Sequence, residues 1–470
     1  MDGFELMITT ANSEISRKKL VSESDWLAST PCFYDLKAGV VSSKIQKITS
    51  NLKSPKIHLE GLYNYLDFGY SVFEQTPIED VRFLRHSSRI WREESGALAV
   101  EHLPDPFDQY AGRKITEFDV IELIRERVQT WEASLPADQE IVLPLSGGFD
   151  SRLLLWCLRD PKRVRAYTYG ISENQDRSTE VVHAQALASH FGIRWERIPL
   201  GDFHSYFDSW DAEFGLSTHA HGMYHFEFYT KIRERLKGRH AFLSGIIGDV
   251  WAGSIPPRVI NNPAELIKLG YTHGLHADPT NARLGSKHQL RDNFWVEHCE
   301  RLTDSRFQVV SSMRFKLIML SYLMRVPRLF DFEPWTPFLD IDVAMAMLNL
   351  PPERRANRQW QRDFFAKVGL DLESQGLKSS RGNSLDFQGL KQVSVRALDV
   401  ERLSDYFDRN YIEWINREVS LTPYKEIRNK CLGIPKIGGA LRRIGLKDKA
   451  MEAYNAYVCL RPIDNYLRGI

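Results

Sequence analysis

The stretch Glu140-Ile-Val-Leu-Pro-Leu145 is a short apolar run that leads at once into Ser146-Gly-Gly-Phe-Asp-Ser151. An apolar helical pattern over residues 153–158 follows, so we expect a strand, a glycine turn and a helix in direct succession. At such a turn, Gly147 and Gly148 let backbone N–H groups approach an anion closely, and the helix start adds further donors. Ser146 and Ser151 would add hydroxyl donors, and Asp150 could hold Mg²⁺ on the anion. A plain glycine turn needs neither the two serines nor the aspartate. The loop therefore predicts a pyrophosphate site, and it is not a Walker A loop because no Gly-Lys-Ser/Thr follows.

Strand and helix patterns alternate after this loop. Residues 165–170, 194–199 and 241–243 have the pattern of strands, and residues 181–191 form an alanine-rich helical pattern. This order is typical of a parallel α/β sheet. A helix that Thr116 and Asp119 can cap precedes the sheet.

The two ends of the chain have different patterns. Residues 1–112 are predicted to be β-rich, with turns inside residues 32–41 and 90–100. The chain beyond about residue 300 is predicted to be mainly helical, and its end is rich in Lys and Arg. We expect domains at 1–112, 113–390 and 391–470.

Composition excludes several classes of protein. The 470 residues include 62 Lys and Arg against 61 Asp and Glu, with 43% hydrophobic residues. These values exclude a mainly disordered chain and a global basic field for nucleic acid. No run is apolar enough to span a membrane, and the first residues lack the pattern of a signal peptide, so a cytoplasmic location is expected.

Cysteine and histidine patterns do not point to a metal site. The five cysteines are dispersed, which favours reduced thiols over disulfides or zinc ligands. Three histidines lie within His219-Ala-His-Gly-Met-Tyr-His225, and a loop that lines a pocket is a better interpretation of them than a metal site.

Several motifs in this order resemble the asparagine synthetase family, whose pyrophosphatase loop usually has Leu at the position of Phe149. Ser244-Gly-Ile-Ile-Gly-Asp249, followed by Ala252-Gly253, is similar to its second motif, Ser-Gly-x-Gly-x-Asp-Glu and Phe-Gly-Gly. Other segments also resemble family motifs, and together the likenesses extend over residues of about 116–390. His183–Gly192 is similar to the helix after the family's nucleotide-binding strand, and Pro337–Asp340 matches its Pro-Phe-Leu-Asp motif. Arg358–Arg362 resembles its Lys-x-x-Leu-Arg helix, and Lys378 lies where the family has its catalytic lysine. The resemblance implies a parallel-sheet PP-loop synthetase domain with a shortened glutaminase-like N-terminal domain and a helical C-terminal region.

The resemblance also implies roles for individual residues. Asp150 and Asp249 would hold Mg²⁺ on ATP, and Lys378 would neutralise charge on the α-phosphoryl group and the leaving pyrophosphate. Residues implied to cradle pyrophosphate are Ser146, Gly147, Gly148, Ser151 and Ser244, and those implied to lie against adenosine are Tyr169, Gly170 and Gly245. Residues 337–340 would be structural, with Asp340 near a helix N-cap.

The N-terminal region departs from the family. Residues 33–43 and 61–70 resemble the later part of the family's glutaminase domain, and Thr76-Pro77 lies near its usual connection. Members that hydrolyse glutamine carry Cys directly after the initiator Met, whereas this sequence has Asp2 there. An internal Cys32 lacks the free amine that such a nucleophile uses, so we expect a remnant without glutaminase activity.

The second motif also departs from the family. True asparagine synthetases have Glu at the positions of Ile246 and Val250, and an aliphatic side chain can handle neither an amine nor its proton. The resemblance thus implies an ATP-dependent, AMP-forming ligase that joins a small-molecule or peptide carboxylate to an amine or ammonia. A separate protein could deliver the nitrogen or the peptide.

Alternatives are macrolactam or lasso-peptide cyclisation, amidation of a polysaccharide sugar acid, a PP-loop tRNA-modifying enzyme and a non-catalytic pseudo-synthetase. The missing CxxC pairs and the weak basicity argue against the tRNA enzyme. The presence of Asp150, Asp249 and Lys378 argues against the pseudo-synthetase.

Overall fold

A computed structural model of the chain describes residues 18–52, 56–271, 274–283, 288–433, 443 and 448–469. Asp2 and the other N-terminal residues, on which the expectations about a signal peptide and a terminal nucleophile depend, lie outside the described residues.

The centre of the fold is a five-stranded parallel sheet with the strand order β11-β10-β7-β8-β9. Its strands are β7 (Ile141–Pro144), β8 (Val164–Thr168), β9 (Arg194–Arg197), β10 (His240–Leu243) and β11 (Phe332–Trp335). The chain moves outward from β7 through β8 to β9, and then returns to place β10 and β11 on the other side of β7. The direction of winding therefore changes between β7 and β10, which is where open α/β sheets bind ligands, beyond the carboxyl ends of the strands.

Four of these strands, β7 to β10, confirm the predicted pattern around the glycine loop. The fifth, β11, is an additional strand that the sequence did not predict, in a region that is mainly helical as expected. The segment Phe332-Glu-Pro-Trp335 has no clear alternation and contains Pro334. Proline is tolerated in a strand at the edge of a sheet, and β11 lies at that edge, paired with β10.

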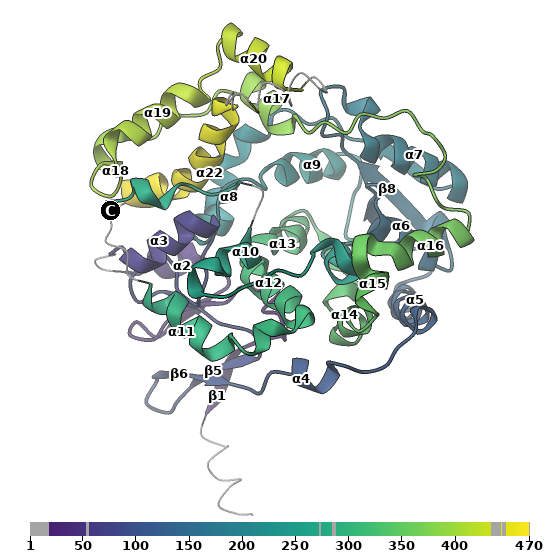
Figure 1. Ribbon diagram of the computed structural model, residues 1–470, viewed down its shortest axis with the longest axis horizontal. Coiled ribbons are helices and arrows are strands. Elements are labelled where there is room, and N and C mark those ends of the chain that lie inside the picture. The colour runs from purple at the N-terminus through teal and green to yellow at the C-terminus, as the bar shows by residue number, and fades with distance from the viewer. Residues whose placement is uncertain are drawn as a thin grey trace, which may run out of the picture.

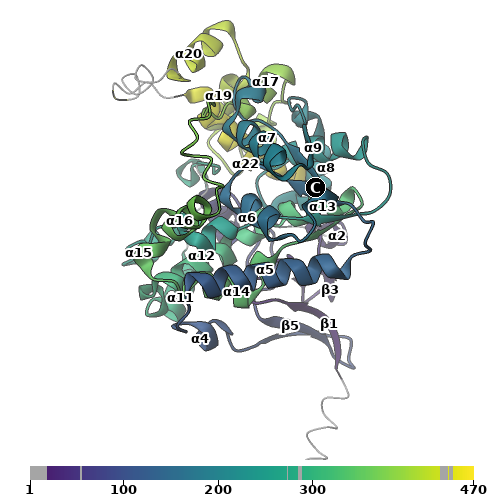
Figure 2. The same cartoon turned by 90° about the vertical axis from the view of Figure 1, so that its right-hand side faces the viewer.

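Helices cover the sheet and connect its strands (Figure 1). The helix predicted from Thr116 is α5 (Glu117–Ser134), and Thr116 and Asp119 form the predicted capping box. It packs on α6 (Phe149–Cys157) and α14 (Ile341–Leu348), and Figure 2 shows it crossing beneath α6. The other helices around the sheet are α7 (Thr179–Phe191), α8 (Phe207–Phe214), α9 (Tyr224–Arg233), α10 (Ile267–Gly270), α11 (Gln289–His298), α12 (Ser305–Leu320), α13 (Tyr322–Leu329), α15 (Pro352–Arg355), α16 (Gln359–Lys367) and α17 (Leu385–Gln392).

The described N-terminal region is built from two small antiparallel sheets and short helices. One sheet has the order β1-β5-β6 and the other β3-β2-β4. Their bounds are β1 (Lys19–Ser24), β2 (Phe33–Asp35), β3 (Val40–Ser42), β4 (Arg82–Phe83), β5 (Ser88–Arg92) and β6 (Leu98–His102), with helices α2 (Ile45–Thr49), α3 (Leu59–Phe68) and α4 (Phe107–Tyr110). The hairpins β2–β3 and β5–β6 confirm the turns predicted inside residues 32–41 and 90–100.

The C-terminal region is helical, as expected. It consists of α18 (Val400–Leu403), α19 (Arg409–Val419), α20 (Pro423–Gly433) and the long α22 (Lys449–Arg468). The hydroxyl of Tyr65 in α3 donates to the carbonyl oxygen of Cys459 in α22 at 3.1 Å, so the first and last regions touch directly. One hydrophobic core contains residues of all three expected domains. The boundaries at residues 112 and 390 therefore do not separate independent hydrophobic cores, and the three domains stay a proposal that rests on sequence patterns. No helix in the described ranges is both long and apolar enough to cross a bilayer.

Candidate active site

The predicted pyrophosphate loop leaves the carboxyl end of β7 and begins α6. Gly148 is the N-cap of this helix, and no side chain caps the helix, so its first N–H groups are available to an anion. The Ser146 hydroxyl accepts from the Gly148 N–H at 3.3 Å and lies 3.5 Å from the Ser151 hydroxyl. Gly147 is required here, because its φ is +69° and a Cβ atom would lie 2.2 Å from the Cβ atom of His183 in α7. The loop therefore has the form that the sequence predicts.

The second predicted loop leaves the adjacent strand β10 and reaches the first. The backbone N–H of Asp249 donates to Oδ2 of Asp150 at 2.7 Å, which joins the two loops across the point where the sheet changes direction. Between them, a Cβ atom on Gly248 would lie 2.8 Å from Cγ of Asp150, so only glycine allows this approach. Ile247 has a φ of +55°, a costly conformation for a β-branched residue and one that is typical of functional sites.

Asp150 is a buried carboxylate with one unsatisfied oxygen. Its Oδ1 atom is buried and has no hydrogen-bond partner among the described residues. Burial, and then the nearby charge of Asp249, raise the pKa of Asp150 well above the usual carboxyl value. A cation between the two carboxylates would satisfy Oδ1 and remove their repulsion, so the donor set fits Mg²⁺. No group of three or more His, Cys, Asp or Glu side chains is arranged to hold a metal ion within the described ranges. Phosphate oxygens and water would have to complete the shell.

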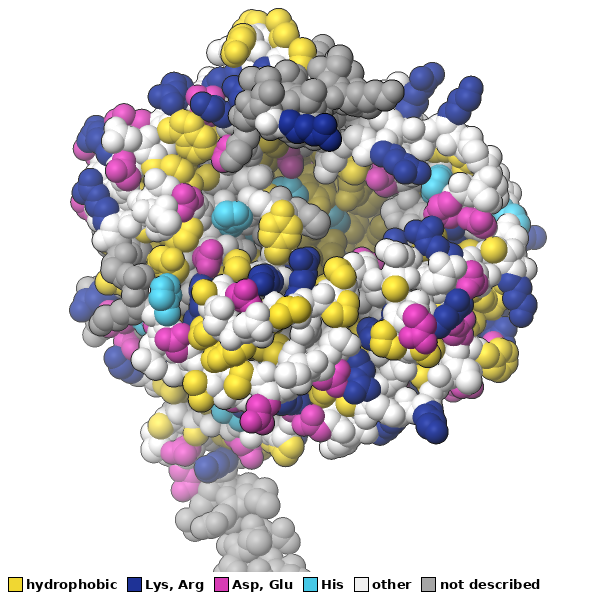
Figure 3. Space-filling model, viewed as in Figure 1, with side chains coloured by type: hydrophobic (Ala, Val, Ile, Leu, Met, Phe, Trp, Pro, Cys, Tyr) yellow, Lys and Arg dark blue, Asp and Glu magenta, His cyan; other side chains and the backbone are white. Residues whose placement is uncertain are grey.

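Two adjoining cavities meet at the pyrophosphate loop. The larger, of about 600 Å³, extends from Asp150 and Ser151 past Tyr169 and Ser244 to Gly245. Figure 3 shows a hollow with hydrophobic side chains near the centre of this face, in the region between α9, α13 and α16 of Figure 1. The smaller, of about 320 Å³, includes Gly147. Of the nine residues expected to bind the nucleotide, only Gly170 lines neither cavity. A Cβ atom on Gly170 would lie 2.3 Å from the carbonyl oxygen of Gln175, so this glycine allows tight backbone packing.

Three arginines line the smaller cavity, and the sequence motifs indicated no role for any of them. They are Arg358, Arg362 and Arg381. Arg358 and Arg362 lie 4.6 and 5.5 Å from the centroid of the Phe149 ring, directly beside the loop. None of the three forms a salt bridge with any residue that the structure describes. Guanidinium groups that have no carboxylate partner and lie beside a helix N-terminus would attract the negative charge of a polyphosphate to this cavity. The spacing of Arg358 and Arg362, four residues apart, could have indicated a shared helix face.

Comparison with known families agrees with this geometry. The family model described as asparagine synthase matches residues 124–369, a little over half of the chain. The chain belongs to the asparagine synthase family. No curated protein matches the sequence. Members of this family are ATP-dependent ligases, and the matched range includes both loops and Arg358–Arg362.

Lys378, the catalytic lysine expected of an asparagine synthase family member, lies beyond the matched range. It is exposed and lines neither cavity. Its segment is nevertheless held at the rim of the site, since the backbone N–H of Thr179, at the start of α7, donates to the Ser380 carbonyl oxygen at 3.1 Å. On the other side, the fully buried Arg152 donates to both carboxylate oxygens of Glu373 at 2.9 Å and to the Gly147 carbonyl oxygen at 2.7 Å. Hydrogen bonds at Glu373 and Ser380 thus hold the segment around Lys378 next to α7 and the pyrophosphate loop. The role of Lys378 stays a prediction.

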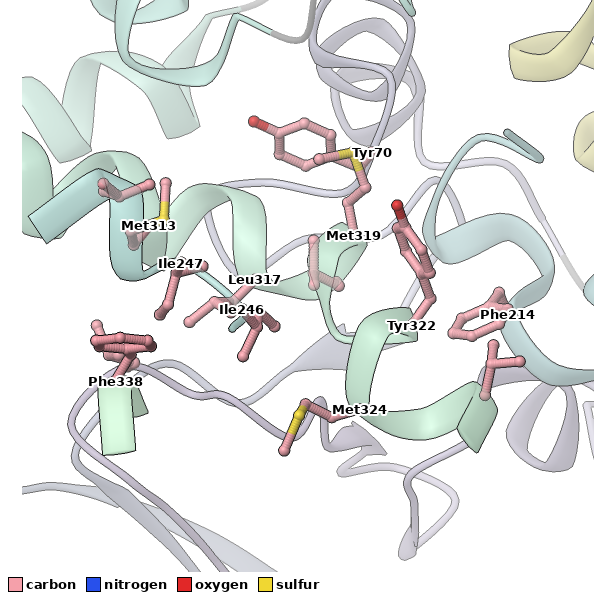
Figure 4. Packing of buried hydrophobic residues seen from close by; sticks show 14 of the residues in the cluster. Tyr70, Phe214, Ile246, Ile247, Met313, Leu317, Met319, Tyr322, Met324 and Phe338 are labelled. Carbon is pink, nitrogen blue, oxygen red and sulfur yellow. The ribbon is translucent and has the colours of Figure 1, made fainter. Parts of the chain in front are cut away.

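The two positions of the second motif that carry aliphatic residues in place of Glu, Ile246 and Val250, differ in whether they line the larger cavity. Ile246 and its neighbour Ile247 line the larger cavity, as expected for Ile246, whereas Val250 is buried but is not part of the cavity wall. Figure 4 shows Ile246 and Ile247 in one apolar cluster with Leu317 and Phe338. The cavity wall is therefore apolar at position 246, where the resemblance to true asparagine synthetases implies a Glu.

Of the three clustered histidines, only His225 lines the larger cavity. His219 is buried with its Nε2 atom 3.1 Å from the Met319 sulfur, and His221 pairs with Asp386 at 3.2 Å. Burial lowers the pKa of His225 to about 3, so its imidazole is neutral. Its Nδ1 atom has no hydrogen-bond partner in the described part of the chain. The expectation of a loop that lines a pocket is therefore only partly met, because His225 lines the cavity but belongs to helix α9.

Lys316 is a further cation near Asp249 that the sequence did not reveal. Burial lowers the pKa of this α12 side chain, and the charge of Asp249 opposes that effect. Lys316 lies more than sixty residues from Asp249 in sequence, so no local pattern could have indicated that their charges interact.

Proposed function

We propose that this asparagine synthase family member activates a substrate carboxylate with ATP and transfers the acyl group to an amine or ammonia. The observation that carries the proposal is the meeting of Asp150 and Asp249 at the carboxyl edge of the sheet, beside a cavity with three unpaired arginines. An anion-binding helix start, two carboxylates and a cationic cavity match the α-phosphoryl, metal and pyrophosphate portions of ATP.

In the first step, an oxygen of the substrate carboxylate forms a bond to the α-phosphorus. The bond from that phosphorus to the bridging oxygen breaks, and pyrophosphate leaves with the electron pair. The uncapped N-terminus of α6 and the hydroxyls of Ser146 and Ser151 would bind the phosphate oxygens. Arg358, Arg362 and Arg381 would hold the leaving pyrophosphate, and Lys378 would neutralise charge on the α-phosphoryl group. Asp150 and Asp249 would hold Mg²⁺, which supplies positive charge to the phosphate oxygens when it is bound.

In the second step, the nitrogen nucleophile forms a bond to the acyl carbon, and AMP leaves with the electron pair of the acyl–oxygen bond. The nitrogen then loses a proton. In this chain no carboxylate occupies position 246 to hold the nucleophile. The neutral imidazole of His225 has an unpartnered nitrogen in the same cavity wall, and we propose that it accepts a hydrogen bond from the incoming amine.

The apolar wall also indicates the class of acyl group. Ile246, Ile247 and Leu323 line the larger cavity. Burying a charged α-amino group against them would leave a charge unpaired, at a cost of several kcal/mol. We therefore propose a bulkier and less polar carboxylate than aspartate.

ATP–pyrophosphate exchange against a panel of carboxylates tests this function. We expect exchange with at least one large, weakly polar acid, and negligible asparagine from aspartate, ATP and ammonium. If the purified protein supports no exchange with any acid of the panel, the proposed adenylation is wrong. If it makes asparagine efficiently, the adenylation is right but the assignment of the acyl class is wrong.

The N-terminal region is proposed to be a scaffold that resembles part of a glutaminase domain. Its contacts with α11 and α12 fit that role, since Asp105 pairs with Arg314 of α12 at 2.7 Å and Asp67 pairs with Arg291 of α11 at 2.6 Å. The cytoplasmic location stays a prediction from the sequence.

A further inference from the structure

A third cavity lies between the N-terminal region and helices α11 and α12. Its volume is about 220 Å³, and it shares no lining residue with the two cavities at the pyrophosphate loop. The wall combines residues 72–74 and 82–86 with side chains of both helices. It is therefore separate from the proposed site of ATP.

One side of this third cavity is aromatic. The rings of Phe73, Phe294 and Phe315 form a mutual cluster, with centroid separations of 5.5, 5.4 and 4.9 Å. Phe294 also contacts the ring of His298 edge-on at 4.5 Å. The edges and faces of these aromatic rings can pack against a flat or branched apolar group of a ligand.

On the other side, three of the lining residues have buried nitrogen atoms that lack partners. Nε of Arg85, Nδ1 of His86 and Nδ1 of His298 are buried and make no hydrogen bond to any described residue. Buried polar atoms are nearly always hydrogen-bonded, and each unpartnered one destabilises the fold unless a ligand or water satisfies it. Arg85 keeps its charge partly balanced, because its Nη1 atom lies 3.2 Å from Glu297 and 3.8 Å from Glu74.

Arginine and carboxylate charges both act on the two histidines at this end of the cavity. Burial, and then the charge of Arg314, lower the pKa of His86 well below its usual value, and Asp105 opposes them. Burial lowers the pKa of His298 as well; the charge of Glu297 opposes that effect, and the cations Arg301, Arg85 and Arg314 add to it. Both imidazoles are therefore neutral, and each can donate one N–H to an acceptor.

The backbone around this cavity is strained. Ala28, Phe73 and Glu74 line it with φ angles of +55°, +54° and +60°, and Ser87, next to His86, has a φ of +50°. None of these is glycine or asparagine, so each of these backbone conformations is energetically unfavourable. Such strain clusters at ligand sites, because the surrounding structure keeps it where a particular geometry is needed.

We propose that this cavity binds a small monocarboxylic acid with an aromatic or branched apolar body, as a second ligand of the protein. The ring or branch would pack on Phe73, Phe294 and Phe315, and the carboxylate would accept from Arg85, His86 and His298. Glu74 and Glu297 in the same wall would repel a dianion, which disfavours phosphate. The volume is below the usual range for drug-sized ligands and suits a body of about ten heavy atoms.

Calorimetric titration of the full chain tests the proposal without any reference to catalysis. The probes are phenylacetate, 3-phenylpropionate and 4-methylvalerate, with phenylacetamide as the neutral match of the first and inorganic phosphate as the dianion. We expect saturable binding of at least one acid below about 5 mM and little binding of the amide or of phosphate. Arg85→Met should weaken acid binding about tenfold or more, because it removes a charged donor.

A pair of surface variants keeps the test decisive if Arg85→Met does not fold. Asn293 is exposed on α11 and lines the cavity, so Asn293→Trp should block it, whereas Asp292→Trp, at the exposed neighbouring position that does not line it, should bind like the wild type. The proposal is overturned if none of the three acids binds at about 5 mM, if phenylacetamide binds as tightly as phenylacetate, or if Asn293→Trp leaves the affinity unchanged. These results do not depend on the exchange assay, so failure of this proposal and failure of the proposed adenylation are distinguishable.

Discussion

Asp150→Asn should separate the metal-binding role of this carboxylate from its effect on stability. The side chain is buried, its Oδ2 atom accepts from the Asp249 N–H at 2.7 Å, and its Oδ1 atom has no partner among the described residues. The amide keeps the shape of the side chain and an oxygen that can accept from the same N–H. It removes one charge from the proposed Mg²⁺ shell, so AMP formation should fall by a factor of at least about 100.

The same substitution should stabilise the metal-free protein. An unsatisfied buried polar group costs about 1–3 kcal/mol and a charged one costs more, so a neutral amide should raise the free energy of unfolding by at least about 1 kcal/mol. The stability of the wild type should fall with rising pH, because burial and the charge of Asp249 raise the pKa of Asp150 in the folded state. Between the ordinary carboxyl pKa of the unfolded chain and the raised pKa of folded Asp150, the folded chain binds more protons than the unfolded chain, so the wild type loses stability as the pH rises through that window.

Denaturant unfolding in EDTA, at pH values from about 4 to 8, would measure this effect. The advantage of Asp150→Asn over the wild type should grow from acid to neutral pH. Addition of Mg²⁺ and ATP should stabilise the wild type, by about 2.7 kcal/mol at a ligand concentration 100 times Kd, and the variant far less.

Asp249→Asn is the matched control, because Asp249 is only half-buried. It should lose AMP formation without the gain in stability. Normal turnover by Asp150→Asn would refute the metal role, and a metal-free variant less stable than the wild type at neutral pH would refute the argument from the buried charge.

Further predictions concern other residues of the proposed site. Lys378→Met should lower turnover about 100-fold or more with little change in ATP affinity by calorimetry, and equal loss of both would contradict a role in the transition state. Arg358→Met should raise the pyrophosphate concentration needed for half-maximal exchange, whereas Arg354→Met, whose arginine pairs with Glu117 and Asp363 on the surface, should not. The protein should release no glutamate from glutamine, because burial raises the pKa of the Cys32 thiol; glutaminase activity that a thiol-alkylating reagent destroys would show otherwise.

Local sequence determined much of the central domain. The apolar run at residues 141–144, the two glycines and the helix that follows are adjacent in the chain, so their order alone predicted the loop. The Thr116 and Asp119 capping box was predictable for the same reason, since both residues lie within one helical turn. The spacing of motifs also predicted the family, which the match over residues 124–369 confirms.

Tertiary structure decided which distant side chains share a site. Arg381 joins Arg358 and Arg362 only because the chain returns beside α7, and Lys316 is near enough to Asp249 for their charges to interact only because the fold brings α12 close to the second loop. The strand β11 was not predictable from its own residues, because its pairing with β10 and not its alternation makes it a strand. Side-chain periodicity reports the face of one element, whereas a cavity is formed by several elements, and their packing is a property of the whole chain.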